Sequence, residues 1–260
     1  MDRNLGALDT KYHSDGGKTG YYQFGRKDPF RANVKVWSYD QDTFAATEYT
    51  GGGRIIISRA TIEEQYATGG ENMPYSIMHP REFITNSGAW TDGQFNPTPY
   101  NSSIVWQDPQ ISNKFENEET DKSIFDPCPL GWSVPVDGWA RGLIGDSSGD
   151  ATGSLYVYFQ WVNNIQSGSV DNANGRTYYP NGYLVDRDIP NAQKIYFPAF
   201  GCLNIASGTL YAVGVYANYW SCSPRNATYG YYLYFNSSRV TPSNADATFA
   251  NGFPVRCVQK

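Results

Sequence analysis

The segment Tyr229-Gly230-Tyr231-Tyr232-Leu233-Tyr234-Phe235-Asn236 decides the fold class of this chain. It is a continuous aromatic run bordered by turn residues, which is typical of a β-strand. Because successive side chains of a strand point to opposite faces, alternate residues from Tyr229 to Phe235 share one face, and those from Tyr232 to Asn236 share the other. Antiparallel sheets often bury one face and leave the other in water. We therefore predict that the first face enters the core and that the second stays wet.

Working outward from this segment, similar short runs predict further strands and only a few helices. The predicted strands are Leu155–Phe159, Lys194–Phe197, Tyr211–Tyr216 and Phe253–Val258. The predicted helical segments are one that begins at the capping box Thr61–Glu64, one over Asp137–Gly145 and a turn at Pro80–Ile84. The rest of the chain reads as long polar loops, and loops of such length are often functional.

Composition limits the classes to which the protein can belong. Of the 260 residues, 16% are aromatic and 17% are charged, and the net charge is −5. Many aromatic and few charged residues argue against disorder, and the acidic balance argues against nucleic acid as a partner. The longest apolar run, Arg54–Ser58, is too short to cross a bilayer, so we expect no membrane insertion by this chain. We expect one domain over residues 1–260, with a loop-rich insertion around residues 36–122.

Cysteine and histidine spacing indicates a disulfide protein without a metal or cofactor. Cys128, Cys202, Cys222 and Cys257 form no C-x-x-C pair, and the two histidines stand alone, so the spacing typical of zinc sites is absent. Four cysteines allow three pairings, and the sequence does not choose among them. Two disulfides in an oxidising compartment are favoured over buried thiols. Since no signal peptide opens the chain, an exported protein implies that Met1 is not the natural start.

The chain contains a serine-hydrolase motif but not the histidine base that such an enzyme needs. Gly145-Asp146-Ser147-Ser148-Gly149 matches G-x-S-x-G, but no histidine follows it to act as the base. We therefore expect a surface turn there and a protein that is not an enzyme.

The segment of residues 211–251 has the composition of a binding surface. It is dominated by Tyr, Asn, Ser, Ala, Thr and Gly, with isolated Arg225 and Arg239. Tyrosine gives a large contact area at a low entropic cost, and Ser, Gly and Asn give adaptable hydrogen bonds. The alternative is that these tyrosines pack a β-core, and we expect this for Trp220, Tyr231 and Leu233, together with Phe235.

Motifs of one known family lie along the whole chain. They are Asp2–Ala7, Tyr21–Phe30, the DPCPLGWSVP segment Asp126–Pro135, Tyr219–Ser221, Tyr231–Asn236 and the GFPVRCV segment Gly252–Val258. In these segments the chain resembles the Fibrobacter succinogenes major paralogous domain, which occurs in surface proteins of Bacteroidetes. Ser133 departs from the usual arginine, and Cys202 and Cys222 are additions to the pattern.

The resemblance implies an α+β, C-type-lectin-like domain with small antiparallel sheets, two or three short helices and long loops. In such domains a disulfide ties an early helical region to the last strand, and Cys128 with Cys257 fits that bridge. The two additional cysteines, Cys202 and Cys222, then pair with each other. The calcium-dependent sugar triplets of true lectins are absent, so calcium-mediated sugar binding is not implied.

The C-terminal segment also resembles the variable proteins of diversity-generating retroelements, in which a C-type-lectin-like scaffold displays mutated positions. By position, this resemblance implies that the ligand-binding residues are Tyr216, Asn218, Arg225, Asn226, Thr228, Tyr232, Tyr234, Asn236, Arg239, Thr241, Asn244, Asp246 and Thr248.

The sequence thus predicts a non-enzymatic receptor or adhesin at a cell surface, or on a phage particle, that binds a protein or glycan on another cell or surface. Two alternatives stay open. One is a structural or tip subunit of a fimbria, which would present a fixed edge for strand pairing. The other is a relative of formylglycine-generating oxidases, which would need Cys202 and Cys222 as reactive thiols.

Overall fold

The structure is a computed structural model. It describes residue 5 and residues 20–31, 36–39, 46–49, 55–58, 72–85, 106, 122–123, 125–141, 159–162, 175–178, 195–225 and 228–259. The predicted helix that begins at Thr61 and the G-x-S-x-G motif at residues 145–149 lie outside these ranges. So does most of the predicted strand Leu155–Phe159, of which Phe159 opens an observed strand.

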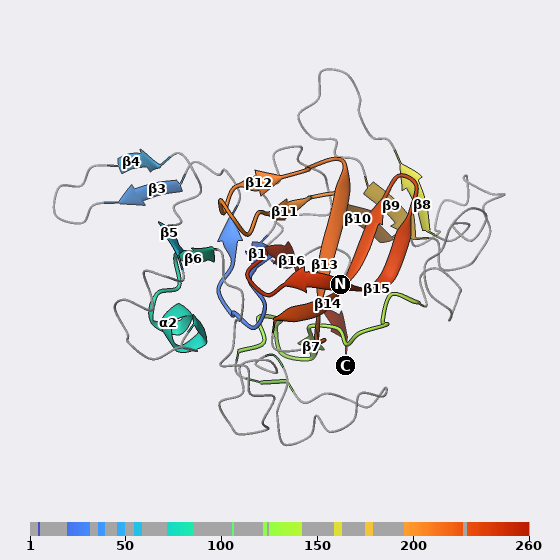
Figure 1. Ribbon diagram of the computed structural model, residues 1–260, viewed down its shortest axis with the longest axis horizontal. Coiled ribbons are helices and arrows are strands. Elements are labelled where there is room, and N and C mark those ends of the chain that lie inside the picture. Colours follow the sequence, from blue (N-terminus) through green and yellow to red (C-terminus); the bar gives the residue numbers. More distant parts are fainter. Residues whose placement is uncertain are drawn as a thin grey trace.

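The molecule is built from short strands in small sheets around one longer central sheet (Figure 1). The strands are β1 (Gly20–Tyr22), β2 (Phe30–Arg31), β3 (Val36–Tyr39), β4 (Ala46–Tyr49), β5 (Ile55–Ser58), β6 (Glu82–Thr85), β7 (Trp132–Ser133), β8 (Phe159–Val162), β9 (Gly175–Tyr178), β10 (Ile195–Pro198), β11 (Cys202–Leu203), β12 (Leu210–Tyr211), β13 (Tyr216–Pro224), β14 (Tyr229–Asn236), β15 (Val240–Thr248), β16 (Phe253–Pro254) and β17 (Val258–Gln259). The sheets are β16-β1-β2, β10-β9-β8, β11-β12, β13-β14-β15, β17-β7, β3-β4 and β5-β6, and only β5 and β6 pair in parallel.

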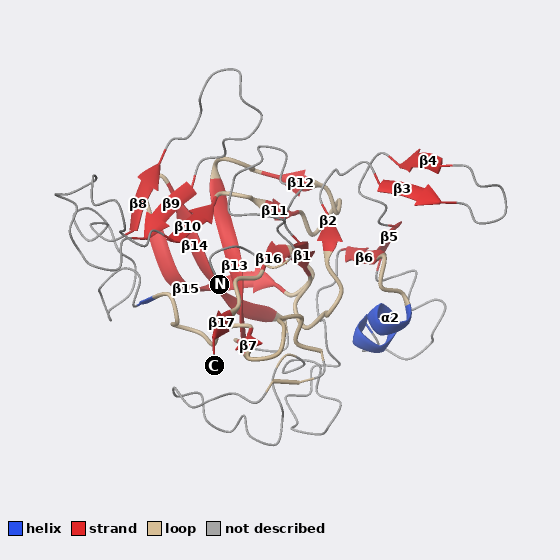
Figure 2. Ribbon diagram, turned by 180° about the vertical axis from the view of Figure 1, so that it is seen from behind, coloured by secondary structure: helices blue, strands red, loops and turns tan. Residues whose placement is uncertain are grey.

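The α+β prediction is wrong: the molecule is β-rich. In the described ranges the helical residues are the seven of α2 (Asn72–Met78) and Arg141, whereas strands and the loops between them make up the rest (Figure 2). The turn predicted at Pro80–Ile84 is confirmed only at Pro80 and Arg81, where Glu82 N–H donates to His79 O at 3.1 Å; from Glu82 onward the chain is β6, which pairs with β5 along its whole length. The predicted helix Asp137–Gly145 does not begin at Asp137, because residues 137–140 form turns in which Gly138 has a φ of +76°; Arg141 is helical, and residues 142–145 lie outside the described ranges.

The central sheet β13-β14-β15 is covered on both faces. On one face Tyr219, Leu233 and Phe235 pack against Phe197 of β10 in one cluster. On the other face, the main cluster contains Trp220 and Tyr232 together with residues of β1 and β16. The side chains of β14 thus alternate between two faces as predicted, with Leu233 and Phe235 on one face and Tyr232 on the other. The face that we expected to lie in water is, however, covered at Tyr232.

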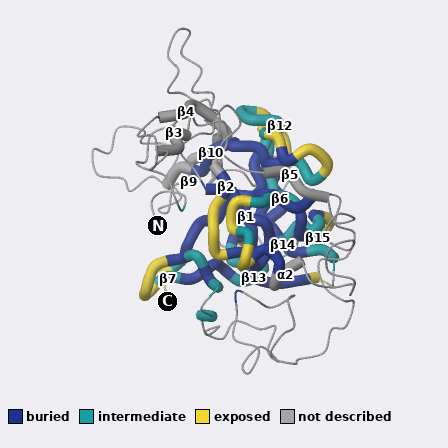
Figure 3. Tube along the Cα trace, turned by 90° about the vertical axis from the view of Figure 1, so that its left-hand side faces the viewer, coloured by how far each residue is buried: buried dark blue, intermediate teal, exposed yellow. Residues whose placement is uncertain are grey.

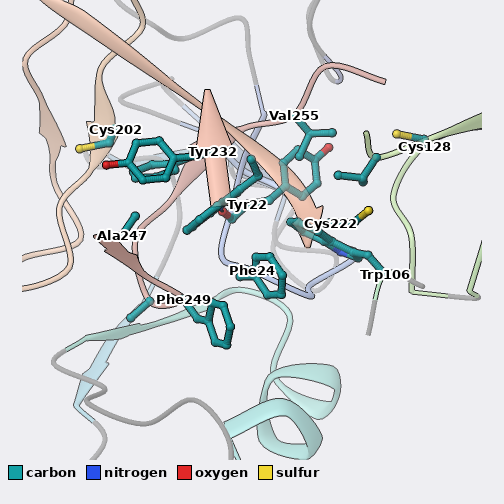
Figure 4. Close-up of a cluster of buried hydrophobic side chains, with 14 of the residues drawn as sticks. Tyr22, Phe24, Trp106, Cys128, Cys202, Cys222, Tyr232, Ala247, Phe249 and Val255 are labelled. Atoms are coloured by element: carbon teal, nitrogen blue, oxygen red, sulfur yellow. The ribbon is translucent and has the colours of Figure 1, made fainter. Parts of the chain in front are cut away.

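Two contacts fix the main cluster to the central sheet. Trp220 Nε1 donates to Tyr22 O at 2.8 Å, which ties β13 to β1. Next to it the rings of Phe24 and Phe249 stack with centroids 4.2 Å apart. A Cβ on Gly230 would come within 3.0 Å of the Phe24 ring, so glycine is what lets these rings approach β14. Figure 4 shows this cluster.

A buried glutamine joins segments that are distant in sequence. Gln23 is fully buried, and its Nε2 donates to both Ile84 O and Ala250 O at 2.7 Å. Its Oε1 accepts from Ile84 N–H and from Arg26 Nη1. Because each polar atom of the amide has a partner, burial of Gln23 connects β6 to the central sheet without an unsatisfied group.

Arg26 holds α2 against β6. Its buried guanidinium donates to the carbonyl oxygens of Ser76, His79, Pro80 and Glu82, at 2.7–3.3 Å. Three of these carbonyls belong to the C-terminal end of α2 or to the turn after it, where carbonyls lack helical partners. Burial lowers the pKa of Arg26 to about 10, so the side chain stays charged at neutral pH and attracts these dipoles.

The predicted bridge between Cys128 and Cys257 is confirmed. It ties the turn before β7 to the segment before β17, and β7 and β17 pair directly. The buried carboxylate of Asp126 orders this turn, since it accepts from Cys128 N–H at 2.7 Å and Val134 N–H at 3.0 Å. Lys122 Nζ lies 2.7 Å from the same carboxylate and neutralises it.

The predicted bridge between Cys202 and Cys222 is wrong. Both are buried thiols. Gly201 bridges Ala217, and Cys222 lies five residues further along β13, which at about 3.3 Å per residue is roughly 16 Å away. A disulfide requires Cα atoms closer than about 7 Å. In Figure 4 the two thiols lie at opposite ends of the main cluster.

The remaining strand predictions have mixed outcomes. Lys194–Phe197 and Tyr229–Phe235 are confirmed as β10 and β14. Tyr211–Tyr216 is wrong as one strand, because the chain turns after β12 and resumes as β13 at Tyr216. Phe253–Val258 is divided between β16 and β17.

Candidate functional site

The register of the central sheet gathers tyrosine and amide side chains on one face. In β13 and β14 Tyr216 lies opposite Asn236, and Asn218 lies opposite Tyr234. In β14 and β15 Tyr234 lies opposite Thr241, and Tyr232 lies opposite Asn244. We call this set the tyrosine–amide face; its members are Tyr216, Asn218, Tyr232, Tyr234, Asn236, Thr241 and Asn244. All of them belong to the predicted ligand-binding residues, so the sheet brings these together as expected.

This face has an inner end, where Tyr232 lies opposite Asn244, and an outer end, where Tyr234 lies between Asn218 and Thr241 and Tyr216 lies opposite Asn236. Asn218, Tyr232 and Thr241 are only 6–7% exposed, whereas Tyr216 and Tyr234 are half-buried, as are the two other amides. The expectation that Tyr232 points into solvent is therefore wrong, because its ring packs on Trp220 and Phe253 with centroids 6.0 and 5.2 Å away. At the outer end the side chains within reach of a partner are those of Tyr216, Tyr234 and Asn236, which lie beside the buried Asn218 and Thr241.

A polar network satisfies the inner end. Tyr232 donates its hydroxyl proton to Asp246 Oδ1 in a short hydrogen bond and accepts from Asn244 Nδ2 at 2.8 Å. Burial, followed by the hydrogen bond to Asp246, raises the pKa of Tyr232. The hydroxyl thus stays protonated, and the network fixes the ring rather than presenting it.

The outer end is ordered by the turn between β14 and β15. Asn236 Oδ1 accepts from the backbone N–H groups of Ser238 at 2.8 Å and Arg239 at 2.7 Å. Its Nδ2 donates to the Tyr234 hydroxyl at 2.9 Å. Arg239 Nε donates to Thr241 Oγ1 at 2.9 Å. Because Asn236 closes the turn and holds Tyr234 at the same time, the exposed groups are held in place before any partner arrives.

Three tyrosines form an aromatic row toward the solvent. The ring centroids of Tyr211 and Tyr216 are 6.1 Å apart, and those of Tyr216 and Tyr234 are 5.9 Å apart. The Tyr216 hydroxyl lies 3.6 Å from Cys202 Sγ. Burial raises the pKa of Tyr216 and also that of the Cys202 thiol, so both keep their protons at neutral pH.

Charged and threonine residues among the predictions lie at the rim of the sheet. Arg225, Arg239 and Asp246 are exposed, and Arg225 Nη1 donates to Ala245 O at 2.9 Å. Thr228 and Thr248 are half-buried and take part in backbone contacts at the end of β15 rather than facing the aromatic row. Asn226 lies outside the described residues.

Sequence reasoning missed Tyr211 and Val215 as site residues. Tyr211 is 56% exposed and Val215 is 61% exposed, and Figure 3 shows exposed chain beside β12. Both flank a turn in which Ala212 has a φ of +57° and Gly214 a φ of +77°. The glycine inside the run 211–216 was the available signal, because it marks a break in a strand.

Other kinds of site have less support in the structure. A cavity of about 290 Å³ is lined by Arg26, Lys27, Ile77 and Phe125, among others, but Arg26 is engaged by the carbonyls at the end of α2. Within the described ranges, no three His, Cys, Asp or Glu side chains gather as metal ligands would. None of the helical segments there has the length and hydropathy to span a bilayer.

Comparisons of the chain with models of protein families, with curated proteins and with solved structures give no match. The family resemblances therefore stay predictions, and the candidate site stands on its geometry.

Proposed function

We propose that this protein is a non-enzymatic receptor or adhesin that binds a protein or glycan through the outer end of the tyrosine–amide face. The observation that carries the proposal is the row formed by Tyr211, Tyr216 and Tyr234, which are accessible yet held by the sheet and by Asn236. Rigid, amphipathic tyrosines beside adaptable amides are the groups that make binding surfaces effective at low entropic cost. Arg239 at the rim adds a charged anchor of the type enriched in binding hot spots.

Location at a cell surface, or on a phage particle, is part of this proposal. The Cys128–Cys257 disulfide supports it, because such bridges persist in oxidising compartments. The resemblance to surface proteins of Bacteroidetes points in the same direction. If the segment is diversified, as the second resemblance implies, variation belongs at exposed positions such as Arg239. Asn218, Tyr232 and Thr241 would change less, since they are buried.

The two alternatives find less support in the geometry. Strand addition, expected of a fimbrial subunit, needs a regular edge, whereas β15 contains Pro242 and two register shifts against β14. Such features block edge pairing. An oxidase of the formylglycine-generating type needs reactive thiols near each other, whereas Cys202 and Cys222 are buried far apart and the pKa of Cys202 is raised.

The proposal is tested by presenting the labelled chain to an array that carries both purified extracellular proteins and immobilised oligosaccharides. We expect Tyr234→Ala and Arg239→Ala to weaken binding to the ligands retained by the wild type. Tyr231→Ala is the matched control, because Tyr231 is also half-buried on β14 but points to the opposite face. Binding that survives both test variants, or an array without any ligand, would contradict the proposed function.

A further inference from the structure

One buried acceptor on the tyrosine–amide face lacks a hydrogen bond. Asn218 is 6% exposed, and its Oδ1 accepts from no group in the structure. It lies on β13 between Tyr216 and Trp220, directly opposite Tyr234. A buried amide oxygen without a donor lowers stability, so such an atom in a folded protein calls for an explanation. A ligand that brings a donor to this position would supply one.

A donor lies opposite this acceptor. The Tyr234 hydroxyl accepts from Asn236 Nδ2, which leaves its own proton for an outside acceptor. Since Asn218 and Tyr234 are paired across the strands, their side chains share one small area of the face. A group that both donates and accepts hydrogen bonds matches this pair, and an alcohol hydroxyl is such a group.

On the side of β11 and β13 the surroundings of this pair are uncharged. Tyr216 is neutral, because burial raises its pKa, and so is the Cys202 thiol beside it. The charges at the rim have opposite signs, with Arg239 and Asp246 both exposed. Arg239 lies on the β15 side of the pair, where its Nε donates to Thr241 Oγ1 opposite Tyr234, and it disfavours a cation. The acceptor Asn218 Oδ1 disfavours an anion, so the site favours a neutral polar ligand.

The aromatic row adds an apolar platform. Tyr211, Tyr216 and Tyr234 follow one another at about 6 Å, and Val215 extends the apolar area at the exposed end. A pyranose ring has C–H faces that pack on aromatic rings and hydroxyl groups around its edge. A saccharide therefore matches this aromatic row and the adjoining pair of Tyr234 and Asn218 better than a peptide backbone does, because a peptide backbone has no hydroxyl group.

We propose that the outer end of the tyrosine–amide face binds a neutral saccharide, one of whose hydroxyls donates to Asn218 Oδ1 and accepts from the Tyr234 hydroxyl. This rests on the binding role proposed above and names its ligand class. Because Asn218 Oδ1 is buried, a neighbouring side chain must move to admit the sugar hydroxyl; Tyr216, the next residue on this face of β13, has its hydroxyl in a weak contact with Cys202 Sγ at 3.6 Å.

The test uses the full chain and an array of neutral oligosaccharides of hexose and N-acetylhexosamine units. We expect the wild type to bind at least one of them, and Asn218→Leu and Tyr234→Phe each to weaken that binding about tenfold or more. Asn218→Leu removes the acceptor at similar volume, and its thermal unfolding should show that the fold is retained. Tyr231→Phe, on the opposite face, should bind like the wild type.

Each outcome decides the question. Absence of saccharide binding, or binding that neither Asn218→Leu nor Tyr234→Phe weakens, overturns the assignment. Retention of proteins alone, lost in Tyr234→Ala, would overturn the saccharide and leave the proposed binding function in place. If instead a saccharide binds at a site that no variant of this face affects, both proposals fail.

Discussion

Removal of the Cys128–Cys257 bridge should lower the free energy of unfolding by several kcal/mol. The bridge closes a loop of 129 residues. The chain-entropy relation assigns about 5 kcal/mol at 25 °C to such a loop, and measured values for native bridges are about 2–5 kcal/mol. We therefore expect Cys128→Ala/Cys257→Ala to lose about 3–5 kcal/mol, measured by urea unfolding monitored through tryptophan fluorescence.

The same double variant tests the assignment of the other two cysteines. Because Cys202 and Cys222 are thiols in the structure, reductant should lower the stability of the wild type but leave the double variant unchanged. Cys202→Ala/Cys222→Ala is the matched control and should keep the full response to reductant. A further loss when the Cys128/Cys257 variant is reduced would mean that Cys202 and Cys222 are bonded, and the separation worked out along β13 would be wrong.

Three further predictions concern stability. Gly230→Ala should lower the free energy of unfolding by about 1–3 kcal/mol, because its Cβ would press on the Phe24 ring, and a gain in a urea titration would contradict this packing. Arg26→Lys should speed hydrogen exchange in α2 while leaving exchange in β14 unchanged, since lysine cannot serve the several carbonyls that the guanidinium reaches; equal effects in both would refute the local role. Burial raises the pKa of Tyr22, Tyr216 and Tyr232, so their contribution to stability is fully present below the ordinary tyrosine pKa of about 10 and is lost as the pH rises through the higher folded-state values. Urea unfolding at about pH 9 and pH 11 should show this fall, and equal stability at both would count against it.

Local patterns in the sequence predicted the strand at β14 and the division of its side chains between two faces, because that division depends only on the two-residue period. They did not predict that both faces are covered. The cover on the second face comes from Tyr22, Phe24 and Phe253, which lie far from β14 in sequence. A local pattern contains no information about such long-range packing, so it places Tyr232 in solvent although the side chain is buried.

The same limit explains the errors in helices and cysteines. Glu82–Thr85 is a strand because β5 pairs with it, and the adjacent proline gave no sign of that partner. Cys128–Cys257 was predicted from a resemblance between whole domains, whereas Cys202–Cys222 was predicted from their joint occurrence. The fact that two cysteines occur together in a sequence does not show where they lie in the fold. The β-bridge between Gly201 and Ala217 places the Cys202 and Cys222 thiols far apart.

The burial gradient along the tyrosine–amide face gives its two ends different tasks. At the inner end Trp220 of β13 and Asn244 and Asp246 of β15 hold Tyr232, which ties the three strands of the sheet together. At the outer end Tyr234 contributes its ring and hydroxyl to the surface while Asn236 holds it in place. Side chains that become ordered only on binding lose conformational entropy, which lowers affinity. Because the sheet already orders these side chains on folding, less of this entropy is lost when the ligand binds. Changes at the inner end should therefore alter stability first, and changes at the outer end should alter affinity with the fold intact.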